Sequence, residues 1–319
     1  MAVKIGCAAW TWTEPAHNPP YKDAIRAIGE LGFDGMELIL RDFEDIGGYW
    51  TKEKCREIRE LLDGYGMEVS QFAMFQNVMD GLASLDGAKR QRSIEAFKYG
   101  CEISAALGCD IVNFVSPWPA EITAPNSYLP EYYYINVPGV DPRIRALQTF
   151  QTKLRYHLPK PFEWEKYWET HVEAVREVTK IAGGYGFRLA IENHANTMTP
   201  HTDSVLRLCE EVGEENIGAN LDTVWAYLQR EYIPWAVYKY NNRLFHVHMR
   251  DGDGLAAYNL PVGYGNTDWK AVIKALKDIG YNGYLSLEWA HDSEKKKHCA
   301  DALRFLRELV AEEEGESCR

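Results

Sequence analysis

The chain has 319 residues, of which 46% are hydrophobic, and a formal net charge of −12. This length suits a single α/β barrel with an insertion, and the hydrophobic fraction supplies a large core. The acidic balance argues against nucleic acid as a partner, because a polyanion would be repelled unless basic residues were concentrated locally.

Seven cysteines are scattered along the sequence, and none forms a Cys-x-x-Cys pair. This pattern favours a reduced cytoplasm and argues against a zinc–thiolate site. The chain starts in a strand-like segment, without a basic region followed by an apolar stretch, so we expect no secretion signal. No window approaches the roughly 18 uninterrupted apolar residues of a membrane-spanning helix. We therefore expect a soluble, cytoplasmic protein that does not act at a membrane.

Strand-like and helix-like segments alternate about eight times, which is typical of repeated βα units. The expected strands are 3–8, 35–40, 68–72, 111–116, 188–193, 217–221, 244–249 and 284–288. The expected helices between and after them are 21–31, 51–65, 85–107, 164–185, 202–212, 269–279 and 294–314. Glycines close several of these helices, as expected for turns that need a left-handed residue. The pattern predicts a (β/α)8 TIM barrel, with residues 1–319 as a single domain.

One connection, residues 117–161, is much longer than the others. It follows the fourth strand and contains Trp118, several prolines and the run Tyr132, Tyr133 and Tyr134. Connections of this length are commonly lids, binding loops or interfaces, and this one leaves the barrel face that carries active sites. Aromatic density alone does not separate such a role from structural decoration, so both interpretations stay open.

Four ionisable residues stand at or near the carboxyl ends of the last four expected strands: Glu192, Asp222, His248 and Glu288. Taken singly, each fits a salt-bridged core residue or a satisfied buried histidine better than a ligand. In a barrel, however, the four would converge on one point, and burying them together is costly unless a cation compensates. The set therefore predicts a site for a hard or borderline divalent cation.

The order Glu, Asp, His, Glu on these strands resembles the xylose isomerase-like TIM barrels, and within them the sugar phosphate isomerase/epimerase group. The resemblance also rests on the phrases Ile191-Glu192-Asn193-His194, Asn220-Leu221-Asp222-Thr223, His246-Val247-His248-Met249-Arg250-Asp251, and on residues 261–269 and 280–288. It spans nearly the whole chain apart from the long connection.

This resemblance implies a divalent-metal-dependent sugar isomerase or epimerase that acts on a keto sugar or sugar derivative through a metal-stabilised enediolate. Glu192, Asp222, His248 and Glu288 would bind one ion, commonly Mn²⁺ or Mg²⁺, with Co²⁺ as a further candidate. Glu192 and Glu288 would then exchange the proton from opposite sides of the substrate.

The resemblance further implies that His194, a candidate catalytic residue, and Arg250, a candidate substrate-binding residue, reach the substrate or order the surrounding side chains. Arg250 stands where many relatives have lysine, and a planar guanidinium does not simply replace an ammonium. Bracing of the site is therefore nearly as good an interpretation of Arg250. Asp251 is expected to be a structural partner, and His246 to face the core or the opposite side of its strand.

One position departs from the family. Ketose 3-epimerases usually place a substrate-binding histidine three residues after the metal-binding aspartate, and this chain has Trp225 there. An indole offers a flat apolar surface and accepts no hydroxyl proton, which weighs against a simple free-ketose epimerase. Trp225, Trp118 and the tyrosine-rich connection would suit an aromatic aglycone. The alternative is therefore the barrel subunit of a C-glycoside deglycosidase, which cleaves 3-keto C-glycosides by enolisation and elimination.

A second alternative is a non-catalytic, metal-containing sugar-binding protein, although the intact pair of glutamates argues against it. An AP-endonuclease-like role would need more histidines and a basic groove, which the acidic charge disfavours. We expect a small carbohydrate as the ligand and a homo-oligomer as the assembly. A deglycosidase would instead pair with a small β-rich subunit.

Overall fold

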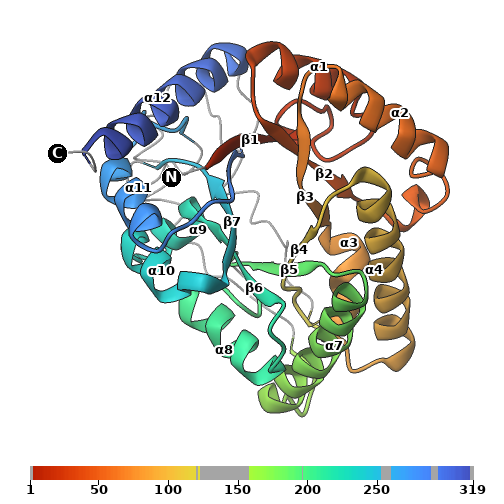
Figure 1. Ribbon diagram of the computed structural model, residues 1–319. Coiled ribbons are helices and arrows are strands. Elements are labelled where there is room, and N and C mark those ends of the chain that lie inside the picture. The colour runs from red at the N-terminus through yellow and green to blue at the C-terminus, as the bar shows by residue number, and fades with distance from the viewer. Residues whose placement is uncertain are drawn as a thin grey trace, which may run out of the picture.

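The computed structural model describes residues 3–119, 121–122, 158–195, 197–252, 260–288 and 294–316. Parallel strands close into a barrel in which each pairs with its sequence neighbours and the last pairs with the first (Figure 1). The strands are β1 (Lys4–Ala8), β2 (Gly35–Leu40), β3 (Glu68–Met74), β4 (Ile111–Val115), β5 (Arg188–Glu192), β6 (Ile217–Asp222), β7 (Leu244–Met249) and β8 (Tyr284–Leu287). The predicted TIM barrel is confirmed.

Helices surround the barrel on its outside (Figure 1). The longer ones are α1 (Lys22–Leu31), α2 (Lys52–Asp63), α4 (Gly87–Leu107), α7 (Trp164–Gly184), α8 (Thr202–Val212), α10 (Ile233–Tyr240), α11 (Trp269–Asp278) and α12 (Lys295–Glu316). Shorter pieces are α3 (Gln76–Met79), α9 (Thr223–Leu228) and the 3₁₀ turns η1 (Ala9–Thr11), η2 (Phe43–Asp45), η3 (Asp80–Ala83) and η4 (Asn241–Arg243).

The seven helices expected from the sequence are present, and none of their ends differs from the expected residue by more than two positions. The sequence reasoning missed α3, α9 and α10, because these helices are too short to show a clear 3.6-residue period. It also ended the third strand too early. Strand β3 continues to Met74, since Ala73 and Met74 pair with Ile39 and Leu40 of β2.

The turns that lead into the strands follow the expected glycine rule. Gly108, for example, ends α4 with a φ of 76°, a conformation that other residues adopt only at a cost. Gly32, Gly66, Gly186 and Gly280 also have positive φ. These turns lie at the amino ends of the strands, which leaves the carboxyl ends free to carry the functional side chains.

The interior of the barrel is polar over much of its length. Buried polar side chains enter it from five strands: Glu37, Gln71, Asn220, His246, His248 and Ser286. His246 and His248 stand two residues apart on β7 and so face the same side, which places His246 in the core, one of its two expected positions. This polar layer supports the carboxyl ends of β5 to β8.

Two further expectations bear on the described residues. The six cysteines that the structure describes are buried free thiols, in line with a reduced chain. Among the same residues, no helix combines the length and the apolar character needed to cross a membrane. Residues 123–157, most of the expected 117–161 insertion with Tyr132, Tyr133 and Tyr134, lie outside the described residues.

Candidate functional site

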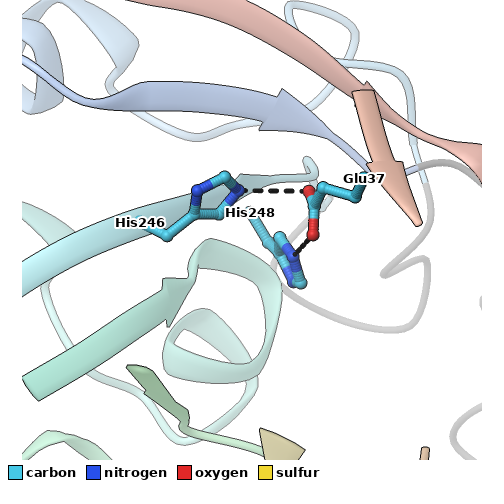
Figure 2. A group of neighbouring side chains, drawn as sticks. All are labelled: Glu37, His246 and His248. Carbon is cyan, nitrogen blue, oxygen red and sulfur yellow. Dashed lines mark hydrogen bonds and ion pairs between the residues drawn. The ribbon is translucent and has the colours of Figure 1, made fainter. Parts of the chain in front are cut away.

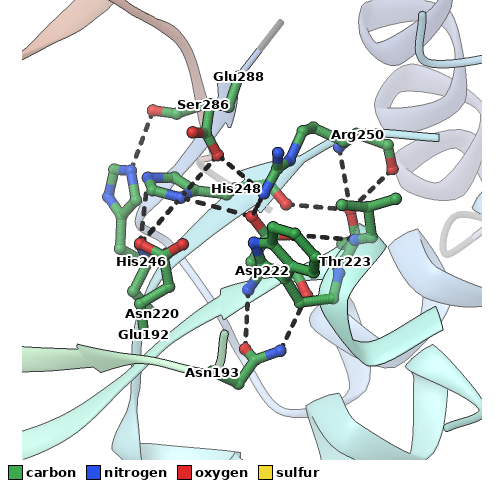
Figure 3. Close-up of polar contacts among 12 residues, drawn as sticks. Glu192, Asn193, Asn220, Asp222, Thr223, His246, His248, Arg250, Ser286 and Glu288 are labelled. Carbon is green, nitrogen blue, oxygen red and sulfur yellow. Dashed lines mark hydrogen bonds and ion pairs between the residues drawn. The ribbon is translucent and has the colours of Figure 1, made fainter. Parts of the chain in front are cut away.

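The four strand-end residues come together as expected. Ligand-type atoms of Glu192, Asp222, His248 and Glu288 all lie within 4.8 Å of one another. His248 is central: its Nδ1 lies 3.4 Å from Glu192 Oε2, 3.3 Å from Glu288 Oε2 and 3.9 Å from Asp222 Oδ2 (Figure 3). Three of these side chains are almost completely buried, and that of Glu288 is 16% exposed.

Two polar side chains link the strand ends that carry the site. The Asn193 side chain donates to the carbonyl of Asp222 at 3.1 Å and accepts from its N–H at 2.9 Å (Figure 3). Thr223 Oγ1 lies 3.0 Å from the carbonyl of His248 and accepts from the N–H of Arg250 at 3.0 Å. Sequence reasoning assigned no role to these two residues, since both contacts join strands that are distant in sequence.

The two carboxylate oxygens of Asp222 have different partners, the first turn of helix α9 and the guanidinium of Arg250. Its Oδ1 accepts the N–H groups of Val224 and Trp225, at 2.9 and 3.1 Å, and so caps α9. Its Oδ2 accepts a hydrogen bond from Arg250, whose guanidinium also lies 3.3 Å from Glu288 Oε2. Arg250 thus contacts two of the four proposed ligands, which supports the bracing interpretation of this residue.

Trp10 is a site residue that the sequence reasoning missed. Its indole N–H donates to Glu288 Oε1 at 2.9 Å, and its ring lies edge-on to His248 at 6.2 Å between centroids. Trp10 belongs to η1, directly after β1, so it too comes from the carboxyl end of a strand. The strand-end rule that identified the other four residues could have found it.

The proton affinities of the carboxylates reflect burial and unequal access to positive charge. Burial raises the pKa of Asp222 to about 7, against the attraction of Arg250. Burial also raises the pKa of Glu192, against the attraction of His248. In Glu288 the effect of burial is outweighed by Arg250 and His248, which hold its pKa well below its usual range. The site therefore holds more carboxylates than its own cations can balance.

The residues fit a divalent cation. Three carboxylates and one imidazole converge, and oxygen with imidazole donors suits Mn²⁺ or Mg²⁺. Glu288 Oε2 is buried and accepts no well-aligned hydrogen bond among the described residues. A cation among these groups would supply the missing positive charge, and that oxygen is available to bind it.

Two of the other predicted site residues, His194 and Trp225, lie beside this cluster. His194 is buried, its Nδ1 lies 2.8 Å from the carbonyl of Ala195, and burial lowers its pKa to about 4. The Trp225 ring packs against the His194 ring, with 4.1 Å between their centroids. The centroid of the Trp225 ring lies 5.2 Å from the guanidinium carbon of Arg250. The indole is only 4% exposed, so it supports both groups more than it offers an open surface. Trp118 is half-buried at the start of the long connection.

Asp251 behaves as the structural partner that we expected. Its carboxylate accepts the backbone N–H groups of Gly252, Gly263, Gly265 and Thr267 and the indole N–H of Trp269, over distances of 2.7 to 3.2 Å. It therefore organises the loop between β7 and α11 without reaching the four proposed ligands.

A further carboxylate, Glu37 of β2, lies beneath the cluster and was also missed. It contacts His246 and His248 (Figure 2), and these imidazoles outweigh the effect of burial to hold its pKa well below its usual range. In the sequence, Glu37 stands inside an apolar strand and far from the other four residues, so no spacing pattern connects it with them.

Comparisons with known proteins find relatives that match along most of the chain. Inosose dehydratase from Clostridium perfringens is 24% identical over 306 residues, which cover 88% of this chain and 97% of that protein. D-psicose 3-epimerase from Enterocloster bolteae is 26% identical over 290 residues, which cover 90% and 82%. The crystal structure of D-psicose 3-epimerase with D-tagatose from Clostridium cellulolyticum H10 superposes with a TM-score of 0.73 at 19% identity, covering 97% and 99% of the two chains.

Residues 25–309 match the family described as Xylose isomerase-like TIM barrel. This match covers most of the chain and includes all four strand-end residues. The chain therefore belongs to the xylose isomerase-like TIM barrel family.

Proposed function

We propose that the protein is a sugar isomerase or epimerase that moves a proton at the carbon beside the carbonyl of a keto sugar or sugar derivative. The observation that carries this proposal is the convergence of Glu192 and Glu288 on His248 Nδ1, at 3.4 and 3.3 Å (Figure 3). Two carboxylates that face each other across one site can remove a proton from one face of a carbon and return one to the other.

Glu192, Asp222, His248 and Glu288 would hold one divalent ion, Mn²⁺ or Mg²⁺, with Co²⁺ as a further candidate. A bound ion of this kind supplies Lewis-acid polarisation of a carbonyl. The chain itself supplies the acid and the base, through Glu192 and Glu288, and holds them in place. Arg250 orients the Asp222 and Glu288 carboxylates. Trp10 holds one oxygen of Glu288, so that its other oxygen faces the site.

We further propose that His194, a neutral imidazole at neutral pH, contacts a substrate hydroxyl, and that Arg250, Trp225 and Trp118 border the bound substrate. Trp225 and Arg250 pack against each other, so together they form one wall beside the proposed ligands.

The relatives support the type of reaction proposed for this chain, deprotonation beside a carbonyl, more than they support any one substrate. A ketose 3-epimerase and an inosose dehydratase both act on ketones, and deprotonation beside a carbonyl can begin either epimerisation or loss of a neighbouring leaving group. Elimination, including C-glycoside deglycosidation, is therefore the second candidate function, and the dehydratase relative is the observation that favours it.

The test is exchange of substrate hydrogen with deuterated solvent. Wild-type protein with Mn²⁺ should incorporate deuterium beside the carbonyl of D-fructose, D-psicose or a 3-keto glucoside, and Glu192→Gln and Glu288→Gln should each lower the rate by at least about 100-fold. Glu95→Gln, an exposed glutamate on α4, is the control and should leave the rate unchanged.

Product analysis separates the candidates. Conversion of one ketose into its epimer supports epimerisation, whereas release of the aglycone from a 3-keto C-glucoside supports elimination. Binding of a keto sugar by the wild type with no exchange would instead favour a sugar-binding protein. Full exchange activity in Glu288→Gln would contradict the proposed proton-transfer pair.

A further inference from the structure

Glu37 reaches the proposed metal site from below, inside the barrel. Its Oε2 lies 2.9 Å from His248 Nε2, and its Oε1 lies 3.1 Å from His246 Nε2 (Figure 2). Gln71 of β3 also donates to Glu37 Oε2, at 2.9 Å. Glu37 and His246 are completely inaccessible to solvent, and His248 is 1% exposed. The carboxylate is therefore held by contacts from both β3 and β7.

The two ring nitrogens of His248 face different carboxylates, and Asn220 Nδ2 lies near both nitrogens, 3.2 Å from Nδ1 and 3.1 Å from Nε2. Nε2 faces Glu37, whereas Nδ1 faces Glu192, Glu288 and Asp222. An imidazole that binds a cation through one nitrogen keeps its proton on the other, and a carboxylate at 2.9 Å is a good acceptor for that proton. We propose that Glu37 is a positioning residue that keeps the proton of His248 on Nε2 and so directs the Nδ1 lone pair into the metal site.

This inference rests on the proposed function, because it assumes that His248 is a metal ligand. His246 contributes indirectly. Its Nε2 lies near both Glu37 Oε1 and Ser286 Oγ, at 3.1 and 3.0 Å, and this contact limits rotation of the Glu37 carboxylate. Partners behind a ligating histidine commonly set its tautomer and ring orientation, and losing one weakens metal binding by about 10- to 100-fold.

Glu37, His246 and His248 are themselves close enough together to suggest a separate metal site. The geometry favours the positioning role. A cation there would need the lone pair of His248 Nε2, which would leave the ring proton on Nδ1, facing three carboxylates. A cation bound by those three carboxylates would then lack an imidazole ligand. The two sites therefore compete for one histidine. Only the upper cluster has a partly exposed member, Glu288, through which an ion could enter.

The first experiment measures Mn²⁺ affinity of the full chain by calorimetry. Glu37→Gln preserves the size of the side chain and removes its charge, and we expect its dissociation constant for Mn²⁺ to rise by about 10- to 100-fold. Glu95→Gln is the matched control, because it makes the same substitution at an exposed glutamate on α4, outside the barrel interior. Its dissociation constant should stay within about 3-fold of the wild-type value.

Unchanged affinity in Glu37→Gln would overturn the positioning role and leave the metal site standing. Absence of Mn²⁺ binding by the wild type would instead show that the proposed metal site is wrong, and the inference would fall with it. Loss of unfolding free energy in Glu37→Gln without a change in Mn²⁺ affinity would assign Glu37 a purely structural role.

The second experiment needs no variant, and so covers the case in which Glu37→Gln does not fold. Nitrogen-15 spectra of histidine side chains in the Mg²⁺-loaded wild type report which ring nitrogen carries the proton. We expect protonated Nε2 and unprotonated Nδ1 in His248. A proton on Nδ1 with an unprotonated Nε2 would overturn the proposal.

Discussion

Arg250 supplies positive charge to two of the four proposed ligands. Its guanidinium contacts Asp222 and Glu288, and it packs near the indole of Trp225. Asp222 is completely buried, so without Arg250 its charge would have no compensation on that side. A lysine cannot place one ammonium against two carboxylates in the same planar way. An arginine at this position therefore gives a geometry that a lysine would not, although the charge would be the same.

Arg250→Met should destabilise the metal-free protein by about 3 to 5 kcal/mol, because it leaves a buried charge unpaired. Added Mn²⁺ should recover part of this loss if the cation replaces the missing positive charge. Urea unfolding with and without Mn²⁺ measures both effects.

The matched control is Arg26→Met, which removes an exposed pair with Asp23 and should cost at most about 1 kcal/mol. Equal destabilisation by the two substitutions would contradict the assigned role of Arg250.

The loop between β7 and α11 is an element built around a single carboxylate. Asp251 accepts five N–H groups from this loop and from Trp269. Gly265 permits the close approach, since a Cβ there would lie 2.3 Å from Asp251 Oδ1 and 2.4 Å from the carbonyl oxygen of Gly252. Asp251 follows directly after Arg250, so these contacts help to place the end of β7.

Asp251→Asn should loosen this loop, because it replaces one carboxylate oxygen with an amide nitrogen. That nitrogen cannot accept the hydrogen bonds that the oxygen accepts in the wild type. We expect a loss of about 2 kcal/mol or more in unfolding free energy and faster amide hydrogen exchange over residues 260–268.

Asp268→Asn is the control on the same loop. Asp268 caps α11 by accepting from the N–H of Ala271, and asparagine caps helices equally well. Similar exchange rates in both variants would show that Asp251 does not organise the loop.

At the scale of the whole molecule, a buried histidine links stability to pH. His171 of α7 is completely buried, with Nδ1 3.4 Å from the carbonyl of Leu82 and Nε2 3.4 Å from Ser116 Oγ. Burial lowers its pKa from 6.5 to about 4, so the folded protein keeps this imidazole neutral. It joins η3, α7 and the segment that follows β4.

The unfolded chain takes up the His171 proton near pH 6.5, and the folded chain only near pH 4. The unfolded state therefore binds more protons between these values, and stability should fall as the pH falls through this window. The part of the unfolding free energy that is lost through protonation of His171 is about 3 kcal/mol.

His171→Gln cannot titrate and should remove this part of the pH dependence. Comparing the variant with the wild type at pH 8, where both are neutral at this position, isolates the cost of the substitution itself. Parallel stability curves for the two proteins from pH 8 to pH 4 would contradict the assignment.

The barrel and its four strand-end residues could be predicted from local sequence patterns. Alternating strand and helix patterns and the glycines that end helices act locally, so they can be recognised without the fold. Parallel strands end at the same face of a barrel, and this rule placed Glu192, Asp222, His248 and Glu288 together before their distances were known. The helices α9 and α10 escaped because they are too short for periodicity to be clear.

The other side chains that contact those four residues could be identified only from the folded protein. Glu37 and Trp10 come from β2 and η1, far away in the sequence, and they meet the site because the barrel closes between β8 and β1. Arg250 could have contacted substrate or protein, and only the distances show that it contacts Asp222 and Glu288. Hydrogen bonds and ion pairs depend on positions within fractions of an ångström, whereas sequence patterns record only which face of an element a residue occupies.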